Sequence, residues 1–171
     1  MADIIDLLAE AGDVAQLRDR RPEAKENAQA SFAALLELSA PGTFSYAERY
    51  AIATFVAGIY QAAPAVAFYS DLLAEESEEL AAEIARAVER GTTTGPYAGG
   101  GFTLFDGAPR LAAALDFAHL LTFHPKDASP AAIGHLQAAG WSDDDIVTLG
   151  QLVSFLAFQL RVAHGLSVLA L

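Results

Sequence analysis

Hydrophobic positions recur with a helical period along almost the whole chain. Apolar residues fall three and four positions apart, and no stretch shows sustained alternation of polar and apolar residues between hairpin turns. The pattern therefore predicts an all-α protein with about eight helices. Because no repeat with a period of roughly 20 to 50 residues recurs, we expect a compact multi-helix bundle rather than a solenoid.

Helix-start and helix-stop signals divide the chain. Asp3 is expected to cap a short helix that carries Ile4, Leu7 and Leu8 on one side. Further helices are expected to start at Pro22, Ser77, Pro109, Ser129–Pro130 and Ser142, with breaks at Ala40–Gly42, Gly91, His124–Pro125 and Gly140. The last of these helices is long and very apolar, and three acids lie at its positive end.

The stretch from Ser45 to Asp71 is the most apolar in the first half of the chain. Ser45 and Glu48 have the spacing of a capping box, in which each side chain binds a backbone amide at the start of a helix. This helix should end near Tyr60 or Gln61. Pro64 fits the first position of a second helix, which we expect to reach about Leu73.

The uncharged run from Tyr50 to Ser70 within this stretch is long enough to span a bilayer. Gly58, Gln61 and Pro64 interrupt it, and no cluster of Lys or Arg flanks it. These features favour a pair of buried helices over a membrane-spanning helix.

Composition narrows the possible partners. The chain has 171 residues, which suits one domain spanning residues 1–171, and 53% hydrophobic against 19% charged residues favours a homo-oligomer. A net charge of −12 disfavours binding to nucleic acid or to a membrane surface. The acidic N-terminus lacks the basic start of a signal peptide, so we expect a cytoplasmic protein.

Two further patterns concern segments without a clear role. Thr92 to Ala108 is rich in glycine, and it reads as a surface loop or subunit arm, or alternatively as a lid over a ligand. A shift of 97 residues places Ser45 on Ser142 and Glu48 on Asp145. This echo indicates either a duplicated helical hairpin or two chance occurrences of a common capping signal.

Four stretches together resemble the carboxymuconolactone decarboxylase domain, or alkylhydroperoxidase D-like, superfamily. They are SYAERYAIATFVAGIYQAAPAVAFY, AGWSDDDIVTLGQLVSFLAFQLRVAHGLSVL, QASFAALL and HPKDA. The resemblance extends over most of the chain. It is closest to the subgroup of carboxymuconolactone decarboxylase domain proteins that lack the Cys-x-x-Cys pair, which often accompany a separate cysteine-bearing alkylhydroperoxidase-domain protein.

The resemblance implies a site at which this chain departs from its redox-active relatives. In those relatives a Glu is followed twelve, fifteen and nineteen residues later by Cys, Cys and His. Here the Glu position is Glu48, and the other three are Tyr60, Ala63 and Ala67. The chain contains no cysteine at all, so thiol-dependent peroxide reduction is expected to be absent.

Each candidate site residue has two interpretations. Glu48 either completes a capping box or acts as a proton-transfer group with a raised pKa. Tyr60, Gln159 and His119 are either buried packing residues with hydrogen-bond partners or the lining of a ligand pocket, together with Ala63 and Ala67. No spacing of His and carboxylate residues indicates a metal site, and no cofactor is expected.

Three functions remain open at this stage. The first is a thiol-free, non-peroxidatic binding or partner subunit, in a homo-oligomer and in contact with a cysteine-bearing relative. The second is a cofactor-free lyase or isomerase that acts on a small organic acid or lactone through Glu48. The third is a structural assembly protein.

Overall fold

The computed structural model describes residues 3–10, 12–91 and 104–170, and within these it leaves out the side chains of residues 13–15. The glycine-rich segment lies outside the described residues at positions 92–103. The described chain contains eight α-helices, two 3-10 segments and no strand, so the predicted all-α class is confirmed. In chain order the elements are α1 (Ile4–Ala9), η1 (Gly12–Arg20), α2 (Pro22–Leu36), α3 (Tyr46–Ile59), α4 (Ala63–Glu76), α5 (Glu78–Gly91), α6 (Pro109–Phe123), η2 (Pro125–Asp127), α7 (Pro130–Ala138) and α8 (Asp143–Leu169).

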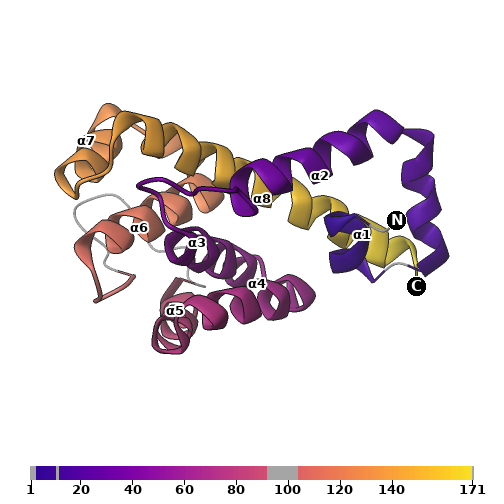
Figure 1. Ribbon diagram of the computed structural model, residues 1–171, viewed down its shortest axis with the longest axis horizontal. Coiled ribbons are helices and arrows are strands. Elements are labelled where there is room, and N and C mark those ends of the chain that lie inside the picture. Colours follow the sequence, from indigo (N-terminus) through magenta and orange to yellow (C-terminus); the bar gives the residue numbers. More distant parts are fainter. Residues whose placement is uncertain (1–2, 11, 92–103, 171) are drawn as a thin grey trace.

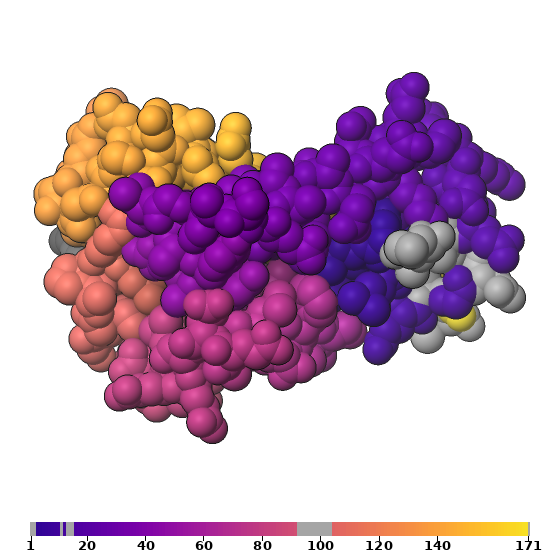
Figure 2. Space-filling view, viewed as in Figure 1, coloured from indigo at the N-terminus to yellow at the C-terminus, as the bar shows by residue number. Residues whose placement is uncertain are grey.

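Two helices organise this bundle. α8 runs along the molecule from α7 at one end to α1 at the other, where its last turns lie beside α1 (Figure 1). α3 contacts α4, α5, α6 and α8, and every residue from Ala51 to Ile59 is buried. Figure 2 shows the elongated outline that results, with α7 at one end and the N-terminal elements at the other.

The predicted capping signals are confirmed where helices begin. The Ser45 hydroxyl accepts from the Glu48 amide, and the Glu48 carboxylate accepts from the Ser45 amide, so both halves of the capping box are present. The side chains of Asp3, Ser77 and Ser142 likewise cap α1, α5 and α8. These starts were predictable because each depends on residues within one turn.

Two details of the prediction differ in the structure. Leu7 is 54% exposed, whereas Ile5 is fully buried with Ile4 and Leu8, because a six-residue helix offers too few positions to fix its inward face. Pro64 is the second residue of α4 rather than the first, and α4 continues past Leu73 to Glu76. Both positions suit Pro, since neither amide has a partner within the helix.

The uncharged run is broken into two helices by the turn between α3 and α4, as the buried-pair interpretation predicted. A different helix, α8, is long and apolar enough by length and composition to cross a membrane, with a mean hydropathy of 1.6 over an 18-residue stretch. Half of that stretch is buried inside the protein, and the core helix of a water-exposed bundle passes the same test. The helix is therefore weak evidence for a membrane.

Candidate functional site

Glu48 lies in a polar cluster where α3 and α8 begin. One carboxylate oxygen accepts from the amide and the hydroxyl of Ser45, each at 2.9 Å. The other oxygen accepts from Nε of Arg110, on α6, at 2.8 Å. Both oxygens are therefore engaged, and a proton-transfer role would first require the ion pair to open.

Asp145 joins the same cluster from α8. Its carboxylate accepts from the Thr43 hydroxyl at 2.8 Å and from Nη2 of Arg110 at 3.2 Å. Burial alone would raise the pKa of Asp145, but hydrogen bonds from Thr43, Ser142 and Arg110 hold it below its ordinary value. Glu48 and Asp145 are the acids that the shift of 97 residues superimposes. In the structure both form ion pairs with the guanidinium of Arg110.

Arg110 is fixed by more than these two acids. Its guanidinium carbon lies 4.0 Å from the ring centroid of Trp141, and Nη2 donates to the Thr43 carbonyl at 3.2 Å. The Trp141 indole N–H donates in turn to the Arg110 carbonyl at 2.8 Å. This cluster ties the starts of α3 and α8 to α6, so its clearest role is to fix the bundle.

The structure separates Glu48 from the other predicted site residues. Glu48 is in the first turn of α3 and Tyr60 follows its last residue, so about 18 Å of helix divides them. The guanidinium of Arg161 lies 5.5 Å from the Tyr60 ring, whose hydroxyl is buried without a hydrogen-bond partner. Ala63 and Ala67 are exposed on α4, and Ala63 lies at the edge of a pocket.

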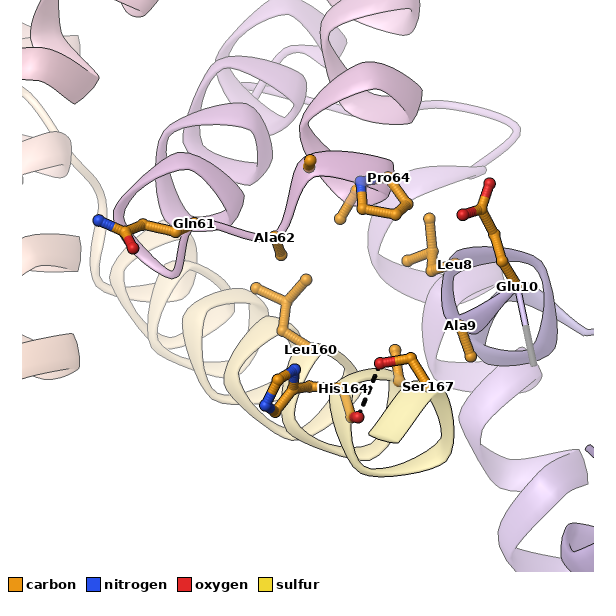
Figure 3. Close-up of a pocket in the computed structure, with 12 residues that line it drawn as sticks. Leu8, Ala9, Glu10, Gln61, Ala62, Pro64, Leu160, His164 and Ser167 are labelled. Atoms are coloured by element: carbon orange, nitrogen blue, oxygen red, sulfur yellow. Dashed lines mark hydrogen bonds between the residues drawn. The ribbon is translucent and has the colours of Figure 1, made fainter. Parts of the chain in front are cut away.

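This pocket has a volume of about 260 Å³ and opens between α1, the α3–α4 turn and the end of α8 (Figure 3). Its lining is mainly apolar, with four polar side chains. The residues are Leu8, Ala9, Glu10, Gln61, Ala62, Ala63, Pro64, Ala65, Leu160, Ala163, His164 and Ser167. Of the predicted site residues, Ala63 alone is in this lining. The sequence did not indicate the contribution of α1, because its approach to α8 depends on tertiary packing.

Two helix ends with left-handed backbone conformations border the pocket. Glu10 and Gln61 have φ angles of 48° and 56°, and they are the two non-glycine residues of positive φ in the described part of the chain. Both line the pocket, one from α1 and one from the α3–α4 turn. Both conformations end a helix: Glu10 is the C-cap of α1, and the amides of Gln61 and Ala62 donate to carbonyls in the last turn of α3. The pocket is the candidate site because these helix ends and α8 enclose a space and line it with a few polar side chains.

Gln159 lies in the interior and outside the pocket. Its side-chain carbonyl accepts from the Tyr69 hydroxyl at 2.6 Å, while its amide nitrogen is buried without a hydrogen-bond partner. Burial raises the pKa of Tyr69, against the smaller effect of this hydrogen bond. The bridge between α4 and α8 matches the structural interpretation of Gln159, but the sequence did not identify Tyr69.

His119 is also buried away from the pocket. Its Nε2 lies 2.8 Å from the Gly91 carbonyl, and its ring packs against Phe123 with centroids 4.8 Å apart. In the described ranges no group of three or more His, Asp or Glu side chains converges as a metal site would require. His119 therefore joins the end of α5 to α6 rather than lining the candidate site.

Asp116, one turn before His119, is predicted to give the fold a measurable pH dependence. Burial raises its pKa from 3.8 to about 6, partly opposed by a hydrogen bond from the Leu104 amide at 3.3 Å and by His135. The folded state then binds this proton more tightly, so stability should fall as pH rises from about 4 to about 6. Asp116→Asn keeps the acceptor and should remove that fall, as urea unfolding from pH 4 to 8 would show. An unchanged slope in the variant contradicts the assignment.

The comparisons with known proteins match this chain by structure and not by sequence. No protein-family profile matches the chain, and no curated protein sequence matches it. Among solved structures it is similar to the crystal structure of an alkylhydroperoxidase AhpD core, an uncharacterized peroxidase-related protein from Ralstonia eutropha JMP134. The TM-score is 0.67 at 21% identity, and the match covers 87% of this chain and 71% of that one.

This chain has the AhpD fold. The structural match confirms the fold expected from the sequence resemblance. Because the identity is 21%, the match establishes the fold alone. The chain adopts this fold without any cysteine.

Proposed function

We propose that this chain is a cysteine-free, non-peroxidatic member of the alkylhydroperoxidase D-like superfamily that works as a binding subunit. The observation that carries the proposal is the mainly apolar pocket beside Ala63, at the position where redox-active relatives carry a cysteine. A volume of about 260 Å³ suits a small molecule. The polar groups of Glu10, Gln61 and His164 suit a ligand with one hydrogen-bonding end, such as a small organic acid or lactone.

The purified protein is expected to show no thiol peroxidase activity. Peroxide reduction through thiol-disulfide exchange requires a thiolate, and this chain supplies none. The measurement is consumption of hydrogen peroxide and of an organic hydroperoxide with a dithiol donor, against a protein-free blank. Turnover clearly above the blank by pure protein would contradict the proposal.

Ligand binding is tested by a matched pair of substitutions on α4. Ala63→Trp places a large ring at the edge of the pocket and narrows it, whereas Ala67→Trp places the same ring at an exposed position outside the lining. Small carboxylic acids and lactones, screened by NMR, should perturb the wild type and Ala67→Trp but not Ala63→Trp. Native mass spectrometry of the purified protein would show a co-purified small molecule or a cysteine-bearing partner. Equal binding by both variants would place the ligand elsewhere.

Proton-transfer catalysis through Glu48 is less well supported. Glu48 is held by Arg110 and lies a helix length from the pocket. If a lyase or isomerase activity is found, Glu48→Gln should leave its rate unchanged.

A further inference from the structure

α8 exposes an unusual amount of apolar surface. Six large hydrophobic side chains are exposed in the described part of the chain, and four of them belong to this helix. They are Val147 (62% exposed), Phe158 (46%), Val168 (52%) and Leu169 (65%). In a chain with 53% hydrophobic residues, this concentration on one helix marks an interaction surface.

These side chains share one face of α8. Val147 and Leu169 lie eleven residues before and after Phe158, which is about three helical turns in each direction. Gly150, Ser154 and Gly165 fall on the same face, where a Cβ added to either glycine would meet no atom within 4 Å. We call this face, from Val147 to Leu169, the outer stripe. Its small residues leave room for another helix to approach closely.

The outer stripe is separate from the candidate pocket. Leu160, Ala163 and Ser167 line the pocket from the opposite side of α8, as the helical period requires (Figure 3). His164 also lines the pocket, at the border of the outer stripe. The inference that follows therefore does not rest on the proposed function. Its experiment addresses different residues.

The spacing of the outer stripe makes it complementary to itself. When two α8 helices pack antiparallel about a two-fold axis at Phe158, Val147 of one copy faces Leu169 of the other. Gly150 and Gly165, eight residues before and seven after the axis, then also face each other closely. A two-fold interface needs such a pattern, since the same patch must serve both subunits.

Charge permits a second copy of this chain to pack on the outer stripe. The chain carries a net charge of −12, so two copies repel wherever carboxylates meet. The outer stripe carries no carboxylate, and Arg161 is its one charged residue. Anionic lipid is disfavoured by the same net charge, and one arginine offers it little attraction.

We infer that α8 is the interface of an isologous homodimer, in which two copies pack antiparallel along the outer stripe with Phe158 at the two-fold axis. The interface excludes water from the apolar face of α8 that the monomer leaves exposed. Close helix contact at Gly150 and Gly165 explains why two glycines persist in a helix that alanine would favour.

The first test compares two apolar-to-charged substitutions at positions of similar exposure. Phe158→Arg places like charges at the axis, whereas Leu17→Arg changes a 44%-exposed leucine of η1, outside the outer stripe. Sedimentation velocity should show a wild-type dimer, an unchanged Leu17→Arg dimer, and a dissociation constant raised by at least about 30-fold in Phe158→Arg. Circular dichroism should show that both variants are folded. If Phe158→Arg does not fold, Ser154→Arg replaces it in the same experiment.

The second test fixes the direction of the two helices. Because the chain has no cysteine, Val147→Cys and Leu169→Cys each introduce a single thiol. When the two variants are mixed and oxidised, a disulfide should join one Val147→Cys subunit to one Leu169→Cys subunit. Two subunits of the same variant should not become linked. The inference would be overturned if the wild type were a monomer or if Phe158→Arg left the dimer intact. It would also be overturned if Val147→Cys formed disulfide-linked dimers with itself, or if a monomer bound to lipid vesicles.

Discussion

Replacing Arg110 with alanine is expected to lower the free energy of unfolding by about 3 kcal/mol. The substitution leaves Glu48 and Asp145 mostly buried, at 17% and 12% side-chain exposure, without their shared cation. It also removes the cation–π contact with Trp141. For a chain of this length the melting temperature should fall by roughly 10 °C, as differential scanning calorimetry would measure.

A surface arginine provides the control. Arg86 is exposed on α5, so Arg86→Ala should change stability by no more than about 0.5 kcal/mol. Arg110→Lys should lie between wild type and Arg110→Ala, because an ammonium cannot present the guanidinium fork to two carboxylates. A loss below about 1 kcal/mol in Arg110→Ala would show that the cluster contributes little to the fold.

The same cluster predicts a pH dependence at the acid end. The pKa of Asp145 is held below its unfolded value, so its contribution is fully present above about pH 4 and is lost as pH falls through the folded pKa. Because Arg110 is one of the donors responsible, Arg110→Ala should lose less stability than wild type over that acid interval. Urea unfolding between pH 2.5 and about 5 compares the two.

The fold was predictable to the extent that its signals are local. Each confirmed helix start depends on a capping residue and an amide within one turn, as at Ser45 and Ser142. The 3-10 segment Gly12–Arg20 was missed because its placement depends on ion pairs of Arg18 with Asp3 and Asp6, made across the α1–η1 corner. The spacing of hydrophobic residues does not predict ion pairs between two such segments.

The candidate site was harder to predict because its contacts join distant positions. Glu48 was recognised as a capping residue, yet its partner Arg110 lies 62 residues away. The predicted group of Tyr60, Ala63 and Ala67 came from the resemblance to redox-active relatives. Of these three residues, only Ala63 is in the pocket lining. Glu10 reaches the same pocket from α1, so proximity there follows from packing rather than from sequence order.

Replacing Tyr69 with phenylalanine is expected to destabilise the protein by about 2 kcal/mol. The Tyr69 hydroxyl is the donor at 2.6 Å to the Gln159 carbonyl oxygen, and the Gln159 amide nitrogen has no hydrogen-bond partner. Both residues are fully buried, so Tyr69→Phe leaves the whole Gln159 amide unpaired inside the bundle. Urea unfolding gives the change in free energy, and Tyr50→Phe, at a partly exposed tyrosine of α3, provides a comparison.

The double variant separates the hydrogen bond from the packing around it. Gln159→Met alone should also cost about 2 kcal/mol, because it leaves the Tyr69 hydroxyl buried without an acceptor. Tyr69→Phe combined with Gln159→Met removes both polar groups at nearly constant volume, so its stability should be close to that of wild type. The cycle should then give a coupling of several kcal/mol. Additive losses would mean that the bridge between α4 and α8 is not what holds Gln159 in the core.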